Sequence, residues 1–508
     1  MKKYLIGIDA GTSRVKAVVF NEAGEEVASF AADNKVYNPG QNRSEQDMRE
    51  LWQVVCRCIR RTLEAADLTG DDIAGLGVSG QGEGLWLVDK DGEPVTMARL
   101  WNDGRAIDTA VSLREAPGME RKFNYVIGGQ PKSGTIIAQA VHAARYEPEL
   151  LEKAEHIFSC KDYIRFKLTG EAHMEPSEAS TSLLDLSTMQ PACELFEELG
   201  VGELTRLMPD IVPSCAVAGK IIKEASELTG LLEGTPVGAG MLDLISAAAG
   251  AGAVGEGDIC ITMGTTFMHQ IVMASYQPTD SMSMSWEAHC TDGLFSRLAG
   301  TMAGTPNLNW ALSVLYGIHE FDADFVGALE EPLSKIPIGS NGVLFHPYTS
   351  VSGERAPFIN ENACGQFSGF KSTTTREHML RAVYEGVVLS SYDCLADVGD
   401  AKGRVFLSGG GAHSAFWVQM LADCLGRELC VAFDKELSAK GAALAAGVAC
   451  GMFADPLSAS RKLSKVQFVY KPDMQRHEKY VELYEIYKGV RQNMPEFWDA
   501  RAAYVKKD

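Results

Sequence analysis

Two aspartates in this chain stand where an apolar run gives way to small residues. Asp9 lies in the segment Gly7-Ile8-Asp9-Ala10-Gly11-Thr12-Ser13, and Asp243 follows the apolar segment that ends in Met241-Leu242. A carboxylate beside a turn that binds phosphate would repel the anion unless a cation lay between them. Because Mg²⁺ binds through one or two carboxylates plus phosphate oxygens, Asp9 is a candidate magnesium contact. The alternative is a turn aspartate that caps its own backbone.

Asp243 is a candidate general base. It lies at or near the start of a predicted helix. A carboxylate in a cleft can take the proton from a substrate hydroxyl, and phosphoryl transfer needs little other covalent help. The alternative is an N-cap or first-turn aspartate that accepts hydrogen bonds from helix amides. The position alone leaves both interpretations open.

Two glycine-threonine turns repeat one pattern in the two halves of the chain. The first is Ile8-Asp9-Ala10-Gly11-Thr12-Ser13, and the second is Ile261-Thr262-Met263-Gly264-Thr265-Thr266. Backbone N–H groups in such turns point at anions, glycine lets a phosphate approach closely, and the hydroxyls add donors. The turns differ at one informative place, since the first has Asp9 where the second has Thr262.

A second pair of glycine-rich segments follows in the same order. Val78-Ser79-Gly80-Gln81-Gly82 ends one buried strand, and Leu407-Ser408-Gly409-Gly410-Gly411 ends another. More residues separate these two segments from each other than separate the two turns. The second half of the chain is therefore predicted to carry an insertion between its turn and its late glycine motif. Together the two pairs predict a duplicated α/β lobe, with a cleft between the two copies.

Periodicity places these segments at the ends of strands. In the first half it predicts strands over residues 4–9, 14–20, 25–31 and 73–79, with a helix over 48–66. In the second half it predicts strands over 258–262, 267–274 and 404–408, with helices over 414–425 and 438–450. Three successive strands that lead into a helix and a strand are typical of a mixed α/β sheet. The small-residue run at 247–252 divides the chain into an N-terminal lobe, 1–247, and a C-terminal lobe, 248–508.

The composition argues against several classes of function. The 508 residues carry a formal net charge of −20, whereas nucleic-acid binding requires a basic face. No apolar run approaches the ~18–20 residues of a membrane span, and the N-terminus lacks a signal-peptide cleavage region. The twelve cysteines are scattered, without a Cys-x-x-Cys pair, as reduced thiols are. We therefore expect a cytoplasmic protein without nucleic-acid or membrane partners.

The familiar nucleotide-binding motifs are absent or misplaced. Residues 75–80 and 250–255 fit G-x-G-x-x-G, but neither match follows a strand and opens a helix, so a nicotinamide oxidoreductase is disfavoured. The chain also lacks G-x-x-x-x-G-K-[ST]. A nucleotide would therefore be bound without a P-loop.

With both aspartates, both glycine-threonine turns and Gly409-Gly410-Gly411, the chain resembles an FGGY-family carbohydrate kinase over essentially its whole length. Segments 365–370 and 378–385 also fit the late signature of that family. The resemblance implies two duplicated actin-like, ribonuclease-H-like lobes, each a mixed sheet flanked by helices, with a central cleft. It implies ATP and Mg²⁺ as cofactors and a small sugar or polyol as substrate, and we expect a homodimer.

The resemblance also implies roles for individual residues. Asp243 falls at the position of the catalytic base, and Asp9, together with Asp243, is expected on the metal side. Nucleotide binding is expected from the two turns, the late glycine motif and the residue at a relative's adenine contact, which are Gly11, Thr12, Ser13, Gly264, Thr265, Thr266, Gly409, Gly410, Gly411 and Ser414.

The substrate loops indicate one branch of the family more than the others. Leu100-Trp101-Asn102-Asp103 is similar to the xylulokinase-like branch, but the Met-His pair of that branch is absent from Gly80-Gln81-Gly82-Glu83, as is the Arg-Glu pair of glycerol kinases. Residues 81–92 look most like L-xylulose kinases and erythritol-type polyol kinases. The expected substrate contacts are Gln81, Glu83, Trp101, Asn102, Asp103 and Asp243.

The expected reaction is ATP-dependent phosphorylation of a terminal hydroxyl of a small ketose or polyol. One alternative is a xylulokinase- or glycerol-kinase-like activity on another sugar or polyol. A second alternative, from a different class, is an actin-like ATPase switch that has no small substrate.

Overall fold

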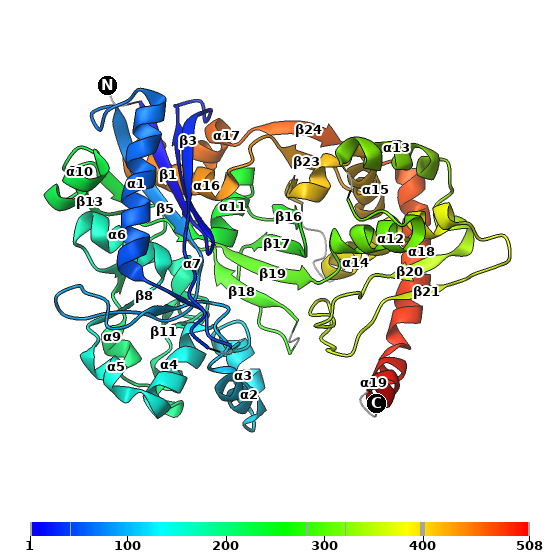
Figure 1. The fold of residues 1–508 in the computed structure, drawn as a ribbon, viewed down its shortest axis with the longest axis horizontal. Coiled ribbons are helices and arrows are strands. Elements are labelled where there is room, and N and C mark those ends of the chain that lie inside the picture. Colours follow the sequence, from blue (N-terminus) through cyan, green and yellow to red (C-terminus); the bar gives the residue numbers. More distant parts are fainter. Residues whose placement is uncertain (1–2, 41, 281–282, 321, 397–401, 506–508) are drawn as a thin grey trace.

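The computed structural model describes residues 3–40, 42–280, 283–320, 322–396 and 402–505. It has two α/β lobes, each built on a mixed sheet with helices on its faces, as Figure 1 shows. This confirms the fold class predicted from the sequence. None of the described helices is long and apolar enough to cross a membrane.

The N-terminal sheet has the strand order β13-β14-β5-β1-β2-β3, with β15 paired to β5. Neighbours β1, β2 and β3 run antiparallel, whereas β1, β14 and β15 run parallel to β5. Its strands are β1 (Tyr4–Ala10), β2 (Arg14–Phe20), β3 (Glu26–Asp33), β5 (Ile73–Gly80), β13 (Val217–Lys220), β14 (Pro236–Gly238) and β15 (Met241–Leu242).

The C-terminal sheet repeats this arrangement in the order β18-β19-β17-β16-β22-β23-β24. Strands β16, β17 and β19 form the antiparallel part, and β22 lies parallel to β16 as β5 does to β1. Its strands are β16 (Ile259–Met263), β17 (Phe267–Met273), β18 (Ser285–Ala288), β19 (Phe295–Thr301), β22 (Val405–Ser408), β23 (Leu429–Ala432) and β24 (Val466–Tyr470). The equivalence of β1 with β16 and of β5 with β22 is the duplication that the paired motifs predicted.

The two lobes differ in where extra chain is inserted. In the N-terminal lobe a region of short elements lies between β5 and β13: β6 (Trp86–Val88), β7 (Ala98–Arg99), α2 (Ile107–Glu115), α3 (Met119–Val126), α4 (Ile136–Tyr146), α5 (Pro148–Lys153), β8 (His156–Phe158), α6 (Cys160–Thr169), β9 (His173–Met174), α7 (Pro176–Ala179), β10 (Leu184–Asp185), β11 (Gln190–Pro191), α8 (Cys193–Glu198), α9 (Leu204–Leu207) and β12 (Asp210–Ile211). In the C-terminal lobe the insertion lies between β19 and β22: α12 (Pro306–Tyr316), α13 (Ala323–Ser334), β20 (Leu344–His346), β21 (Gln366–Ser368) and α14 (Arg376–Leu395).

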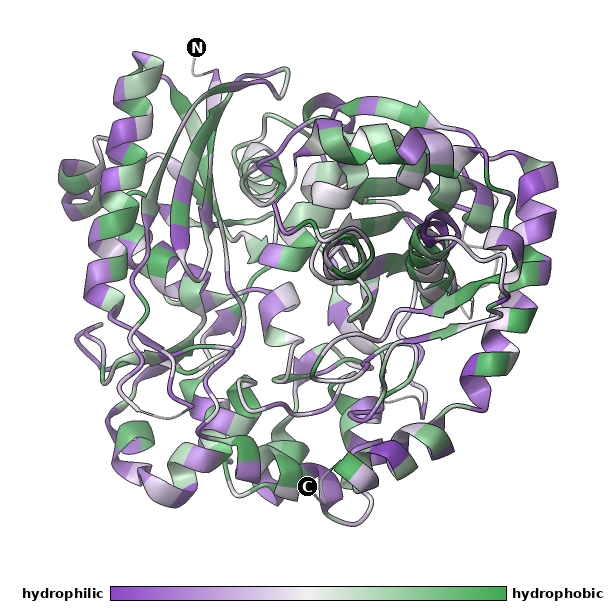
Figure 2. Cartoon of the chain, turned by 45° about the vertical axis from the view of Figure 1, so that its right-hand side comes forward, coloured by the Kyte–Doolittle hydropathy of each residue, from purple (hydrophilic) through white to green (hydrophobic). Residues whose placement is uncertain are grey.

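The remaining elements cover the sheets or complete the chain. They are β4 (Glu45–Gln46), α1 (Met48–Ala66), α10 (Lys223–Thr229), α11 (Asp243–Ala251), α15 (Ala415–Leu425), α16 (Leu437–Ala449), α17 (Pro456–Leu463), α18 (Met474–Gln492) and α19 (Pro495–Val505). Helix α1 is amphipathic: Leu51, Val55 and Ile59 are buried against the sheet, and Asp47 caps its first turn. Figure 2 shows hydrophobic residues gathered on the strands of both sheets and on the helices that cover them.

Helices α11 and α16 lie between the two sheets and pack against each other (Figure 1). Helix α16, from the second half of the chain, covers the N-terminal sheet, where a Cβ atom on Gly7 would lie 1.8 Å from the carbonyl oxygen of Ala439. Helix α11, from the first half, packs its Ala248 and Ala251 against Phe406 of the C-terminal sheet. Small residues therefore let each half of the chain place a helix against the sheet of the other half. The division at residue 247 stays a prediction.

Candidate active site

Asp9 and Asp243 are carried by parallel strands that end at the same edge of the N-terminal sheet. In the pairing with β5, Asp9 lies opposite Ser79, and Leu242 lies opposite Gly80. Because β1, β5 and β15 are parallel, their carboxyl ends lie at the same edge of the sheet. Asp9, Gln81 and Asp243 therefore all lie at that edge. This is the position in which an open α/β sheet binds its ligand.

The two aspartates influence each other's ionisation. Burial raises the pKa of Asp243 to about 7, and the nearby negative charge of Asp9 adds to that shift. Burial also raises the pKa of Asp9 to about 6, against the opposing effect of Lys16. Lys16 is itself paired with Glu436, which reaches it from the segment before α16. A proton acceptor near neutral pH and a second carboxylate are thus held side by side.

The backbone around Asp243 is held on both sides. Asp243 is the first residue of α11, and its Oδ1 accepts a hydrogen bond from the Leu244 N–H at 2.7 Å. The Leu242 N–H donates to the Ser177 hydroxyl at 2.9 Å. From the other half of the chain, the Ser438 hydroxyl lies 3.5 Å from the carbonyl oxygen of Asp243. The local capping role and a position at the sheet edge therefore occur in the same residue.

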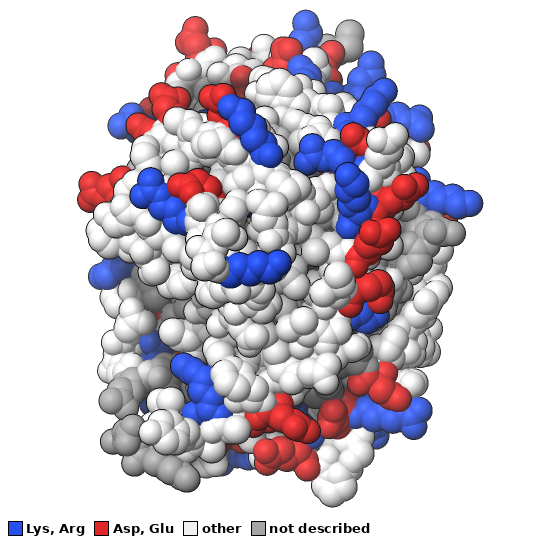
Figure 3. All heavy atoms as spheres, turned by 90° about the vertical axis from the view of Figure 1, so that its right-hand side faces the viewer, with Lys and Arg blue, Asp and Glu red and all other residues white. Residues whose placement is uncertain are grey.

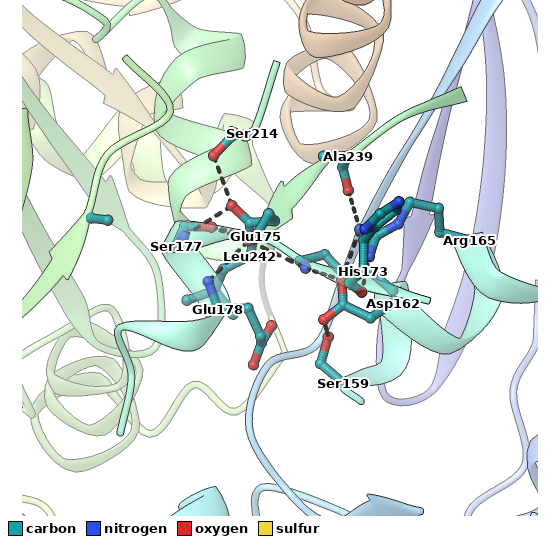
Figure 4. A network of polar contacts seen from close by, with 12 residues as sticks. Ser159, Asp162, Arg165, His173, Glu175, Ser177, Glu178, Ser214, Ala239 and Leu242 are labelled. Carbon is teal, nitrogen blue, oxygen red and sulfur yellow. Dashed lines mark hydrogen bonds and ion pairs between the residues drawn. The ribbon is translucent and has the colours of Figure 1, made fainter. Parts of the chain in front are cut away.

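A buried polar network stands behind this turn, as Figure 4 shows. The Ser177 hydroxyl donates to Glu175 at 2.6 Å, and the Ser214 hydroxyl donates to the other oxygen of Glu175 at 2.7 Å. Glu175 also caps α7 by accepting from the N–H groups of Ser177 and Glu178 at 2.9 Å. Through Ser177, the buried carboxylate of Glu175 fixes the backbone that carries Asp243.

Two buried cations balance the carboxylates of this network. Lys161 Nζ lies 2.6 Å from Asp162 and 3.2 Å from Glu175, and all three side chains are fully buried. Arg165 donates to Asp162 at 2.8 Å and to the carbonyl oxygen of Ala239 at 2.7 Å, just before β15 (Figure 4). Paired and hydrogen-bonded in this way, the charges hold α6, α7 and β15 in one fixed arrangement.

The first predicted phosphate turn is linked to the predicted substrate residues. The Thr12 hydroxyl donates to Gln81 at 2.9 Å and accepts from the Trp101 indole N–H at 3.0 Å. Gln81 in turn donates to Gln46 at 2.7 Å, and Gln46 donates to the Thr12 carbonyl at 2.7 Å. The remaining residues of the turn, Gly11 and Ser13, have carbonyls that accept from Asn34. The structure therefore brings this turn, Gln81 and Trp101 together.

The other predicted substrate residues lie in contrasting environments. Asn102 is exposed, next to Trp101. Asp103 is fully buried, and both its oxygens are occupied, one by the Ser44 N–H at 2.8 Å and both by Arg105. Asp103 therefore holds the loop next to Trp101, and both of its oxygens already accept hydrogen bonds from the protein.

Glu83 occupies an uncommon backbone conformation beside the sheet edge. Its φ angle is +60°, and its N–H donates to Glu178 Oε1 at 2.7 Å. Burial raises its pKa, whereas Lys132 lowers it. A non-glycine residue keeps a positive φ only where its surroundings enforce it, and such positions gather at functional sites.

Two further carboxylates near this site were missed by the sequence analysis. Glu178 is fully buried, its Oε2 has no hydrogen-bond partner among the described residues, and burial raises its pKa well above the usual range. Glu287 comes from β18 of the C-terminal sheet and interacts electrostatically with Glu83 and Asp243. The one available signal for Glu287 was a lone acid inside the otherwise strand-like Ser285-Trp286-Glu287-Ala288.

The second turn and the late glycine motif lie together on the C-terminal sheet. Thr262 and Ser408 are opposite each other on β16 and β22, with their hydroxyl oxygens 3.1 Å apart. They carry the turn Gly264, Thr265, Thr266 and the motif Gly409, Gly410, Gly411 away from the same edge. Gly409 has φ +87°, and a Cβ atom there would lie 2.7 Å from the carbonyl oxygen of Met263, so glycine is required.

Ser414, the predicted adenine contact, begins α15. Its hydroxyl accepts from the Trp417 N–H at 3.0 Å and donates to Glu330 at 2.6 Å. The hydroxyl hydrogen is therefore already engaged, and the free part of this loop is the exposed backbone of Gly409 and Gly410.

The comparisons with known proteins agree with this geometry. The FGGY family of carbohydrate kinases matches with its N-terminal domain over residues 4–250 and with its C-terminal domain over residues 261–450. An erythritol kinase from Brucella abortus (strain 2308) is 32% identical, over 98% of each chain. An L-xylulose/3-keto-L-gulonate kinase from Escherichia coli (strain K12) is 30% identical, over 96% of this chain and 97% of the relative.

A solved structure supports the same assignment. The xylulose kinase from Rhodospirillum rubrum superposes with a TM-score of 0.88 at 25% identity, over 98% of this chain and all of that one (100%). The predicted kinase class is confirmed, and the actin-like switch and the nicotinamide oxidoreductase are set aside. The two duplicated lobes, the carboxylates at the sheet edge and these matches lead to one conclusion: the chain belongs to the FGGY family of carbohydrate kinases.

Proposed function

We propose that this kinase transfers phosphate from ATP to a terminal hydroxyl of a small polyol or ketose, similar to erythritol or L-xylulose. The observation that carries the proposal is the placement of Asp9 and Asp243 at the edge of the N-terminal sheet where β1 and β15 end. The erythritol kinase and the L-xylulose/3-keto-L-gulonate kinase among the relatives support this substrate class. A xylulokinase- or glycerol-kinase-like preference is the alternative.

In this proposal Asp243 accepts the proton of the attacking hydroxyl. A pKa of about 7 leaves a large fraction of the carboxyl ionised at neutral pH, which suits a general base. Ser177 and Ser438 keep its backbone in place, so little reorganisation is needed when the substrate binds. The hydroxyl oxygen then attacks the terminal phosphorus, and the bond from that phosphorus to its bridging oxygen breaks.

The residues at this edge fit a divalent cation. Asp9 and Asp243 oppose each other's ionisation, and a cation between them would relieve that repulsion. Mg²⁺ bound by one or two carboxylates would neutralise the charge of the transferred phosphate. The turns 11–13 and 264–266 would donate to the phosphates, and the motif 409–411, with Ser414, would line the nucleotide site.

A coupled assay for ADP release tests the proposal. We expect at least one C4–C6 polyol or ketose to stimulate ADP release strongly over the rate with ATP alone. Asp243→Asn removes the proton acceptor but keeps the shape, so kcat should fall by about 100- to 10,000-fold while ATP still binds. Exposed Asp71 provides the control, since Asp71→Asn should keep wild-type turnover. Near-wild-type turnover of Asp243→Asn would refute the base assignment.

We also propose that the protein is a homodimer located in the cytoplasm. Figure 3 shows one face of the molecule on which acidic side chains lie mostly toward the margins, while the centre is largely uncharged with a few Lys and Arg side chains. A groove of about 720 Å³ has a mixed lining from α18, α19 and Gln366, in which Ile486, Val490 and Phe497 are apolar and Glu485 and Asn493 are polar. Because each chain carries a net charge of −20, a face with few acidic side chains is where two copies repel least. Sedimentation of wild type against Ile486→Asp tests this, and a monomeric wild type would refute it.

A further inference from the structure

Glu287 is carried to the site by a strand that bridges the two lobes. Strand β18 is the edge strand of the C-terminal sheet, yet it is anchored to the N-terminal lobe on both sides of Glu287. The Trp286 N–H donates to the carbonyl of Gly128 at 2.9 Å, and the Ala288 N–H donates to the Ser180 hydroxyl at 2.8 Å. The position of Glu287 against the N-terminal lobe is therefore fixed by its two neighbours.

The Glu287 carboxyl group is buried without a partner for one of its oxygens. The residue is 9% exposed, and its Oε2 has no hydrogen-bond partner in the described part of the chain. Burial raises its pKa to about 8, the carboxylates of Glu83 and Asp243 act in the same direction, and Lys132 opposes them. Glu287 thus lies beside the α7 region, which also holds the backbone before Asp243 through Ser177.

Glu83 is held against the same region from the N-terminal lobe. The Glu83 N–H donates to Glu178 of α7, so the backbones that carry Glu83 and Glu287 both bond to the segment 178–180. A buried carboxyl oxygen without a partner is costly, and a polyhydroxylated ligand supplies hydroxyl groups that can pair with it. A ligand with its own carboxylate would instead place a negative charge where burial already disfavours the charged forms of Glu83, Asp243 and Glu287.

We propose that Glu287, acting with Glu83, is the specificity-determining residue that binds hydroxyl groups of an uncharged polyol or ketose and excludes sugar acids. The inference rests on the proposed function and narrows its substrate class. Lys132 is the cation that faces these groups, but it is exposed and is shared between Glu83 and Glu287. One solvated ammonium does not offset the burial that disfavours negative charge at Glu83, Asp243 and Glu287.

The test compares matched substrates with wild type and Glu287→Gln. The panel pairs C4 and C5 polyols and ketopentoses with aldonic acids of the same carbon number. For wild type we expect kcat/KM to favour the uncharged compounds by about 100-fold or more. Above pH 8, where Glu287 is mostly ionised, Glu287→Gln keeps the size but removes the charge, so that ratio should fall by about 10-fold, mainly through KM, with kcat for the polyol nearly unchanged.

A second variant and a control keep the result interpretable. Glu83→Gln should shift the ratio in the same direction, whereas exposed Glu256→Gln should leave it as in wild type. The thermal shift caused by ATP shows that each variant is folded. A wild-type preference for sugar acids, or an unchanged ratio in both Glu287→Gln and Glu83→Gln, would overturn the inference while leaving the kinase proposal intact. Failure of every panel compound to stimulate ADP release would overturn both.

Discussion

The two lobes share a strand order but use it differently at the edge where the strands end. In the N-terminal lobe Asp9, Gln81 and Asp243 leave that edge, and a long insertion between β5 and β13 surrounds them. In the C-terminal lobe the equivalent edge carries Thr262 and Ser408, with glycine-rich turns beyond them. The two lobes share one strand order, but the strand-end edge of the N-terminal lobe carries carboxylates and that of the C-terminal lobe carries uncharged hydrogen-bond donors.

The lobes also differ in how their sheets meet the central helices. Glycines of the N-terminal sheet let α16 approach so closely that Cβ atoms on Gly7 and Gly77 would lie 1.8 and 2.0 Å from its carbonyl oxygens. The C-terminal sheet instead presents Cys260 and Phe406 to α11. The contact is backbone against backbone on one side and through side chains on the other.

The first prediction contrasts the two turns. Asp9→Asn should lower kcat by about 100- to 1,000-fold and raise the Mg²⁺ concentration needed for half-maximal rate, because the metal-side carboxylate is lost. Thr262→Val keeps the shape and removes the equivalent polar group, and it should change kcat less than about 5-fold. Titrations with Mg²⁺ at saturating ATP measure both. Equal losses in the two variants would show that the turns act alike.

The second prediction contrasts the two sheets. Gly7→Ala forces a methyl group into the backbone of α16 and should lower the free energy of unfolding by about 3 kcal/mol. Cys260→Ala removes one sulfur facing α11 and should cost about 1 kcal/mol. Urea unfolding of both variants compares them. A larger effect for Cys260→Ala would mean that the side-chain contact is the tighter of the two.

The third prediction uses two serines of the α7 region, one bonded to each lobe. Ser177 binds the backbone that carries Asp243, so Ser177→Ala should lower kcat about 10-fold with little change in the KM for ATP. Ser180 binds β18, so Ser180→Ala should mainly raise the KM for the polyol, by about 3- to 10-fold. Steady-state kinetics separates the two. The same change in both variants would indicate a general loosening of α7.

The last prediction concerns the pH dependence of stability. Glu287 has a pKa of about 8 in the folded protein against an ordinary value of 4.5, so the folded state keeps a proton that the unfolded state has lost. Between pH 6 and 8 the wild type should therefore lose about 1–2 kcal/mol of stability relative to Glu287→Gln. Unfolding midpoints of both proteins at pH 6, 7 and 8 measure this. Parallel pH profiles would contradict it.

The sequence predicted the bounds of helices and strands well where the signals are local, such as an apolar stripe or a capping residue. The helix over 48–66 agrees in both bounds with α1, since its apolar stripe and the cap by Asp47 are local features. The duplication was also predictable, because each copy keeps its turn at the end of the same strand. Asp9 lies on β1 and Asp243 directly follows β15, and both strands pair in parallel with β5. The sequence analysis assigned both residues to one cleft but did not predict these strand pairings.

Features that depend on distant contacts could not be predicted. Glu287 meets Glu83 because an edge strand docks on α7, and nothing near residue 287 in the sequence encodes that docking. Asp103 was predicted as a substrate contact because Leu100-Trp101-Asn102-Asp103 is similar to the xylulokinase-like branch, and this prediction stays untested. The burial of Asp103, and the occupation of its oxygens by Ser44 and Arg105, arise from a loop folded back on itself. Residue type alone does not distinguish these two cases.

The small-residue contact between α11 and α16 has a consequence for motion between the lobes. A Cβ atom on Gly250 would lie 2.1 Å from the Leu437 carbonyl oxygen, and one on Gly441 would lie 2.0 Å from the Ser246 carbonyl oxygen. Two helices that meet without interlocking side chains can slide along each other at low cost, as in shear rather than hinge motion. Because each helix also lies on the sheet of the opposite half, such a slide would carry both sheets with it and couple nucleotide binding to the substrate side.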